Sequence, residues 1–245
     1  MENKPKITVF FPVYNDEKTI RSITLKSIDV LEEIASEYEV LIINDGSPDN
    51  SGKIADELSK EFKNVRVIHH PKNMGYGAAL KTGFQHSQYD IICFTDGDDE
   101  YDISDLKKFI RLKDFYDLII TFRYVRMYST WRIFVSRTYN FVLRFLFKTT
   151  YRDISTGLRM IRKSLIPEIE LISNSPFIGA ELTIKCMLKG YRVGEVGIQT
   201  FPRTFGKGSS VSFINIIKTI KDLKKVHNQI FSSSYDLPKG RYRDL

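Results

Sequence analysis

The stretch that decides the fold is IICFTDGDDEYD, residues 91–102, in which an apolar run leads directly into an acidic cluster. A short apolar run of this kind is typical of a buried parallel strand. Carboxylates that follow such a strand point into the crevice where open α/β sheets bind their ligands. Asp96, Asp98 and Glu100 alternate along the chain, so an extended backbone directs all three side chains the same way.

Crowded carboxylates repel one another unless a positive charge lies among them. A hard divalent cation such as Mg²⁺ or Mn²⁺, itself carrying phosphate oxygens, meets that need, and we predict that Asp96, Asp98 and Glu100 bind it. A solvated acidic loop, or a helix capped by Ser104, explains the same residues without a metal. From these residues alone, both interpretations stay open.

The first half of the chain alternates between apolar and helical segments. Apolar runs that suit strands occupy residues 7–11, 40–43, 65–68, 91–94 and 118–120. Segments with helical character lie between them, at residues 16–36, 51–62, 75–87 and 104–113. This order predicts βαβ units, and therefore an α/β fold with a mostly parallel sheet covered by helices on both faces.

Charge is distributed unevenly over the 245 residues, whose formal net charge is +7. Residues 1–117 are acidic overall, residues 118–163 carry ten Lys and Arg against a single acid, Asp153, and residues 201–245 are basic again. This pattern indicates an anionic partner for the second half. Nucleic acid, a phosphorylated lipid and a membrane surface all satisfy it.

The cysteine content points to a reducing compartment. The chain has two cysteines, too few for a disulfide framework. Cys93 falls in a predicted strand and Cys186 in a predicted helix, so we expect both to be buried thiols. Residues 1–16 lack the apolar region and cleavage site of a signal peptide.

Two amphipathic helices are predicted in the second half. Residues 130–148 combine Trp131 and several Phe with Arg, which suits a headgroup boundary, and we favour membrane contact there. Residues 213–230 place an apolar stripe opposite four lysines. This pattern is typical of a helix that lies at a membrane interface. We favour the simpler interpretation, in which the stripe packs on the protein core. The longest charge-free stretch of the first helix, residues 138–143, is far shorter than the roughly 20 residues that span a bilayer.

Short motifs recur at the ends of the predicted strands. They are PVYNDE at 12–17, NDGS at 44–47, NMGYGAA at 73–79, DGD at 96–98 and DISTGLR at 153–159. With Phe122-Arg123, Arg203 and GKGS at 206–209, they resemble family 2 glycosyltransferases with the GT-A fold. The resemblance is closest to the dolichyl-phosphate mannosyltransferase and polyprenyl-phosphate glucosyltransferase branch. Departures from the branch pattern are Asn44, Glu100 in place of Gln, Thr156 and Leu158.

The resemblance implies an organisation and a set of site residues. It implies one GT-A domain over residues 1–212, a basic amphipathic helix over 213–231 and a flexible tail over 232–245. The nucleotide sugar is expected at Pro12, Tyr14, Glu17, Asp45, Gly75, Asp96, Arg203 and Lys207. The metal is expected at Asp96, Asp98 and Glu100, and the acceptor phosphate at Arg123 and Arg137. Asp98, Arg123 and Arg203 are the expected catalytic residues.

The implied activity is transfer of mannose or glucose from a GDP- or UDP-hexose to a polyprenyl or dolichyl phosphate. It is expected to depend on Mg²⁺ or Mn²⁺ and to invert the anomeric configuration. Such an enzyme is expected to be cytoplasmic and peripheral on the cytoplasmic face of a membrane, directly or through a separate membrane subunit.

Two other functions compete with this interpretation. A family 2 enzyme of surface polysaccharide synthesis transfers to a sugar hydroxyl and needs a general base, for which Glu181 or Asp153 would serve. A basic nucleic-acid-binding protein would show salt-sensitive affinity for DNA or RNA. No recognition motif appears in the sequence and the acidic crevice repels phosphate backbones, so we expect no nucleic-acid partner.

Overall fold

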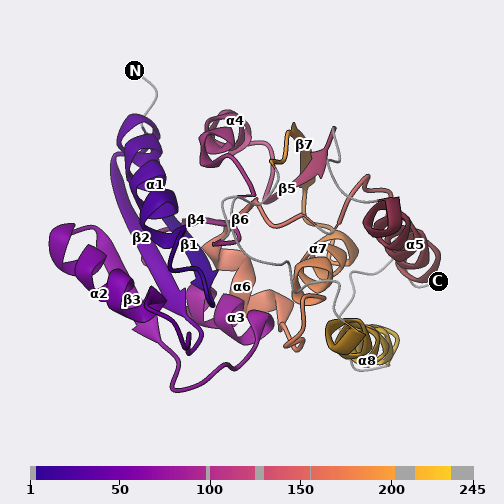
Figure 1. Ribbon diagram of the computed structural model, residues 1–245. Helices are drawn as coiled ribbons and strands as arrows, with labels where there is room; N and C mark the ends of the chain where they lie inside the picture. Colours follow the sequence, from indigo (N-terminus) through magenta and orange to yellow (C-terminus); the bar gives the residue numbers. More distant parts are fainter. Residues whose placement is uncertain (1–3, 98–99, 125–129, 155, 202–212, 233–245) are drawn as a thin grey trace.

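The computed structural model describes residues 4–97, 100–124, 130–154, 156–201 and 213–232. At its centre is a seven-stranded sheet with the strand order β3-β2-β1-β4-β6-β5-β7 (Figure 1). The strands are β1 (Lys6–Val13), β2 (Glu37–Asn44), β3 (Val65–His69), β4 (Ile91–Phe94), β5 (Leu118–Arg123), β6 (Arg159–Arg162) and β7 (Val193–Ile198).

Helices cover both faces of the sheet (Figure 1). The α-helices are α1 (Ile20–Ile34), α2 (Ser51–Glu61), α3 (Tyr76–His86), α4 (Leu106–Leu112), α5 (Thr130–Phe147), α6 (Ile166–Ile169), α7 (Ile178–Leu188) and α8 (Phe213–Ile230). One core lies between the sheet and α1, α2 and α4, and a second lies between the sheet and α3, α6 and α7. The predicted α/β fold is thus confirmed.

The central strand shows why the apolar runs are continuous. β1 pairs in parallel with β2 on one side and with β4 on the other. Every residue of β1 from Ile7 to Val13 is buried, because helices cover both faces of the sheet. A solvent-facing strand would alternate apolar and polar residues instead.

The five strands expected from the sequence are all present. β6 and β7 were not predicted, and β6 also departs from the parallel pattern, since it runs antiparallel to both β4 and β5. Cys93 in β4 and Cys186 in α7 are buried, as expected, and burial raises the pKa of both thiols. The helical turn after the acidic cluster is capped by Asp102, which accepts from Ser104 N at 2.9 Å, so the expected Ser104 cap was wrong.

A third core joins α5, α7 and α8 at one end of the molecule. Leu143 and Phe147 of α5 and Val226 and Ile230 of α8 pack against α7. Figure 1 shows α5 and α8 beside α7, beyond the end of the sheet that carries β7. None of the helices in the described part of the chain is long and apolar enough to cross a bilayer. Of the expected tail, residues 233–245 lie outside the described part.

Candidate active site

The loops that follow β1 and β4 meet at the carboxyl edge of the sheet. Thr19 Oγ1 donates to Gly97 O at 2.8 Å, which fixes the turn after β4 against the start of α1. The backbone N–H of Tyr14 donates to Asp16 Oδ2 at 2.9 Å, and the Tyr14 side chain is 44% exposed. An exposed ring at this edge is accessible for stacking on a nucleobase. Pro12 lies one residue before the end of β1.

Glu17 and Asp45 were both expected to contact the nucleotide sugar. Glu17 Oε2 accepts from Asn50 N and from Asn50 Nδ2, both at 3.1 Å, at an exposed position. Asp45 is buried, and its Oδ1 accepts from Met74 N at 2.8 Å and lies 2.7 Å from His70 Nδ1. Its Oδ2 accepts from Gly75 N at 2.9 Å. The oxygens of Asp45 thus shape the loop before α3, and its contact with the nucleotide sugar stays a prediction.

Gly75 allows that loop to enter α3. Its φ of +94° lies in the region that favours glycine. The next residue, Tyr76, begins α3, and its hydroxyl donates to Asp96 Oδ1 at 2.7 Å. Burial and the neighbouring Asp96 carboxylate raise the pKa of Tyr76 well above its usual value, so the hydroxyl stays protonated and remains a donor.

A second loop, before β6, closes on the same carboxylate. A Cβ atom on Gly157 would lie 2.4 Å from Asp96 Oδ2, so only glycine fits at this position. The Gly157 N–H donates to Tyr101 OH at 2.9 Å. Asp96 is thus bordered by Tyr76 and Gly157, which come from segments far apart in the sequence.

Arg159, at the start of β6, supports this loop from inside the protein. Its side chain is fully buried, and burial lowers the pKa of its guanidinium group. The guanidinium group donates to Thr156 O at 3.0 Å, Ile154 O at 2.6 Å and Thr183 Oγ1 at 2.8 Å, and also to Gly179 O. It therefore ties the loop before β6 to helix α7.

Arg123, the expected acceptor-phosphate ligand at the end of β5, lies beside Asp153. Its Nε and Nη2 approach Asp153 Oδ2 at 2.8 Å and 2.7 Å, and the two side chains are 7% and 1% exposed. Burial opposes the charge of Arg123, but Asp153, Tyr101 and Glu100 together outweigh it, and the pKa of the guanidinium group is raised. Arg123 is therefore held by a carboxylate of the protein, and Arg137 is exposed on α5.

The general bases considered for a hydroxyl acceptor are not available. Glu181 is fully buried and forms an ion pair with Lys185 at 2.6 Å. Asp153 is buried against Arg123. Each carboxylate neutralises a buried cation, which favours neither as a general base, and the polysaccharide alternative itself stays a prediction.

The expected metal ligands are only partly described. Asp98 lies outside the described residues, as do Arg203 and Lys207. Glu100 is buried, 2% exposed, and raises the pKa of Arg123 and of Tyr101, so it lies near both. Among the described residues no group of three His, Cys, Asp or Glu is arranged to hold a metal. Carboxylate oxygens remain the donors that Mg²⁺ and Mn²⁺ prefer, so the chemistry of the expected set fits such an ion.

Sequence reasoning did not assign site roles to Tyr76, Tyr101, Gly157 or Arg159. Tyr76 and Gly157 stand inside motifs quoted above, but a motif does not show which of its side chains reaches Asp96. Only the packing of α3 and of the loop before β6 brings these groups together.

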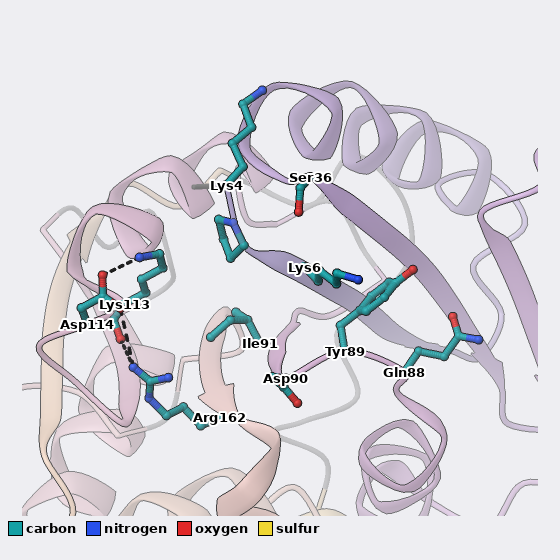
Figure 2. Close-up of a pocket in the computed structure, with 11 residues that line it drawn as sticks. Lys4, Lys6, Ser36, Gln88, Tyr89, Asp90, Ile91, Lys113, Asp114 and Arg162 are labelled. Atoms are coloured by element: carbon teal, nitrogen blue, oxygen red, sulfur yellow. Dashed lines mark hydrogen bonds and ion pairs between the residues drawn. The ribbon is translucent and has the colours of Figure 1, made fainter. Parts of the chain in front are cut away.

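A hollow of about 510 Å³ lies at the opposite edge of the sheet, where β1 and β4 begin (Figure 2). Charged side chains at its rim are already paired: Lys6 with Glu37 at 2.5 Å, and both Lys113 and Arg162 with Asp114. In open α/β folds the ligand lies at the carboxyl ends of the strands, so this hollow is not the candidate site.

The sheet order and the helices on both of its faces are those of the GT-A fold of glycosyltransferases. The model of the family described as Glycosyl transferase family 2 matches residues 8–169, well over half of the chain. The protein belongs to this family, which confirms the expected family and enzyme class.

Solved structures share the fold. Glucosyl-3-phosphoglycerate synthase from Mycobacterium tuberculosis, in complex with Mn²⁺, UDP and phosphoglyceric acid, is 16% identical with a TM-score of 0.72, over 91% of this chain and 78% of that chain. The same enzyme in complex with Mg²⁺ and UDP is 18% identical with a TM-score of 0.69, and the match covers 91% of this chain and 80% of that chain. S. aureus TarS 1-349, in complex with UDP-GlcNAc, is 18% identical with a TM-score of 0.67, over 94% and 68%.

Proposed function

We propose that this family 2 glycosyltransferase moves a hexose, mannose or glucose, from a GDP- or UDP-sugar to a polyprenyl or dolichyl phosphate, with inversion at the anomeric carbon. Similar folds have been solved with UDP and Mn²⁺ or Mg²⁺, and with UDP-GlcNAc, which supports a nucleotide-sugar donor here. The identity of the acceptor rests on the second half of the chain.

The observation that carries the lipid acceptor is the outer face of α5. Phe134, Phe141 and Phe145 are 61%, 69% and 70% exposed, and their spacing of seven and four residues places them on one side of the helix. Exposed Arg137, Arg144 and Lys148 flank this stripe. Exposed aromatic rings beside cations suit the boundary between acyl chains and anionic headgroups.

Helix α8 extends this face. Phe213, Ile214, Ile217 and Ile220 in its first half are exposed, whereas Val226 and Ile230 in its second half are buried. We expected the apolar stripe of this helix to pack on the core, and this is true only of the second half of α8. Exposed Lys218, Lys221, Lys224 and Lys225 border the stripe. The Phe147 ring of α5 packs against His227 of α8, so the C-terminal ends of the two helices are in contact. We propose that the exposed faces of both helices contribute to one apolar and basic membrane-binding region.

A phosphate acceptor also fits the groups that the site offers. A phosphate monoester is ionised near neutral pH, so it can attack the anomeric carbon without a protein base. Glu181 and Asp153, the bases considered for a hydroxyl acceptor, are both buried in ion pairs. A phosphate acceptor avoids the need for either carboxylate.

The roles in the transfer step are proposals from the motifs. Asp98 and Glu100, with Asp96 close by, would hold the ion, and a bound Mg²⁺ or Mn²⁺ would offset the negative charge of the departing nucleotide diphosphate. Arg203 and Lys207 are proposed to contact the same diphosphate and to stabilise the charge that develops on it. Arg123, with its guanidinium group held by Asp153, is proposed to face the acceptor phosphate.

Transfer assays with purified protein test the proposal. Labelled GDP-mannose, UDP-glucose and UDP-GlcNAc are each offered with polyprenyl phosphate in detergent or with an oligosaccharide acceptor. We expect an alkali-stable, acid-labile lipid product with one hexose donor, lost on removal of divalent cations. Transfer to the oligosaccharide alone would support the polysaccharide alternative and overturn the lipid acceptor.

The proposed location is the cytoplasmic face of a membrane, with peripheral attachment, directly or through a separate membrane subunit. Flotation with vesicles of phosphatidylcholine and phosphatidylglycerol separates the two forms of attachment. We expect direct binding that weakens as salt is raised, since exposed lysines attract anionic lipids. Failure to bind any vesicle would leave only attachment through a partner.

A further inference from the structure

The loop of residues 170–175, between α6 and α7, is held firmly on its inner side. Glu181 of α7 accepts from Ile172 N and from Ser173 N, both at 2.9 Å. Lys185, four residues further along α7, donates to Glu170 O at 2.7 Å. Both side chains are fully buried, so the loop is tied to the core by a charged pair that water does not screen.

Helix α8 holds the same loop from a second direction. Asp222 Oδ2 accepts from Asn174 N at 3.0 Å and from Ser175 N at 2.9 Å. Asp222 is the single acidic residue of α8, among four lysines. A carboxylate that accepts two neighbouring backbone N–H groups fixes that piece of backbone more strongly than a neutral acceptor would.

The loop in turn contacts the start of α3. Gly77 N donates to Asn174 O at 3.0 Å, and Lys81 Nζ donates to Asn174 Oδ1 at 2.6 Å. A Cβ atom on Gly77 would lie 2.6 Å from Asn174 Cα, so the two backbones touch without room for a side chain. A shift of Asn174 must therefore move the first turn of α3.

That first turn carries Tyr76, whose hydroxyl donates to Asp96 Oδ1 at 2.7 Å. Contacts thus run without a break from Asp222 through Asn174 and Tyr76 to Asp96. Three segments, α8, the 170–175 loop and α3, form this series.

We propose that Asp222 is a positioning residue for the nucleotide-sugar site, acting through Asn174 and Tyr76 on the orientation of Asp96. The inference rests on the proposed role of Asp96 in donor binding and is independent of the acceptor. It gives α8 a second role: one face of the helix borders the lipid-facing region, and Asp222 supports the donor site.

Nucleotide affinity, measured by calorimetry with Mn²⁺ and UDP or GDP and without lipid, tests the proposal. Asp222→Ala removes the charged acceptor for two backbone N–H groups, and we expect about tenfold weaker binding. Asp222→Asn keeps one oxygen acceptor and should restore affinity to within about threefold of the wild type. Asn228→Ala, at an exposed position of the same helix, is the matched control and should bind like the wild type.

A double-mutant cycle separates positioning from general destabilisation. Tyr76→Phe removes only the hydroxyl that contacts Asp96 and should weaken binding in the same assay. If Asp222 acts through Tyr76, the double variant should bind the nucleotide as tightly as the single variant that has the lower affinity. Unchanged affinity in Asp222→Ala, or losses that multiply in the double variant, would overturn the proposal.

The outcome is separable from that of the proposed function. Weaker nucleotide binding in Asp222→Ala, together with no lipid product from the wild type in the transfer assay, would support the positioning role of Asp222 and reject the lipid acceptor. If Asp222→Ala does not fold, Tyr76→Phe carries the test, and an affinity of Tyr76→Phe equal to that of the wild type overturns the proposal.

Discussion

Asp96 shows how much of the site is determined by neighbours that a motif cannot reveal. The DGD motif marks the carboxylates, but Tyr76 and Gly157, which border Asp96, come from segments 20 and 61 residues away in the chain. Asp45 and Arg123 were expected to contact ligands, and the structure shows that each is also bonded to groups of the protein. A sequence pattern identifies the side chain at the end of a strand. A buried polar side chain also needs a hydrogen-bonding or charged partner, and the pattern does not identify that partner.

At the residue scale, Asp98→Ala should abolish turnover and leave the fold intact. The prediction follows from the expected metal role of Asp98, because a carboxylate in an open crevice contributes little packing. Steady-state transfer with saturating donor measures it, and circular dichroism checks the fold. Asp99→Ala is the matched control, since Asp99 falls outside the alternating set of carboxylates. Turnover retained in Asp98→Ala would remove the metal role.

Arg123→Met should lower the free energy of unfolding by about 3 kcal/mol, because it leaves the buried Asp153 carboxylate without its cation. Denaturant titration measures this loss. Arg111→Met, at an exposed position of α4, should change stability by less than about 0.5 kcal/mol. Equal stability of the two variants would show that the pair with Asp153 contributes little.

Among the elements, the parallel strands could be predicted and the later ones could not. β1 to β5 coincide with apolar runs between helices, and the continuous burial of β1 and β4 follows from the helices on both faces of the sheet. β6 reads RMIR, four residues with arginine at both ends, and the burial of Arg159 becomes evident only from its partners on α7. β7 reads VGEVGI, whose two glycines lower its strand propensity.

The outer face of α5 gives a prediction at the element scale. Phe141→Ser combined with Phe145→Ser should weaken binding to anionic vesicles by about tenfold or more, since each buried Phe contributes about 1.5–3 kcal/mol. Vesicle flotation measures the affinity. Phe115→Ser is the matched control, because Phe115 is 64% exposed but lies outside α5 and α8. Equal losses in both variants would show that the α5 face has no special role.

For the molecule as a whole, the acidic first half holds the donor crevice and the basic second half holds the exposed apolar region. The charge pattern in the sequence indicated this division, but it could not show that α5 and α8 pack side by side on α7. The third core, built by residues from all three helices, places them together. This arrangement agrees with the proposal that donor and acceptor bind at different parts of one fold.

Ligand binding should stabilise the whole domain. With Mn²⁺ and the correct nucleotide at about a hundredfold excess over Kd, the midpoint of thermal unfolding should rise by about 5–10 °C. A panel of UDP and GDP with Mn²⁺, Mg²⁺ or chelator measures the shift. We expect the larger shift with one nucleotide, and only with a metal. A shift that is the same in chelator would contradict metal-assisted binding.

The most direct measurement is a crystal structure of the protein with Mn²⁺ and the nucleotide sugar that gives the largest thermal shift. We expect an anomalous Mn²⁺ peak at the carboxyl edge of β4. The ion should be bound by Asp98 and by diphosphate oxygens, and Asp96 should still accept the hydrogen bond from Tyr76. A diphosphate bound away from this edge, or a Mn²⁺ ion without Asp98 among its ligands, would contradict the proposed metal-assisted binding of the sugar donor.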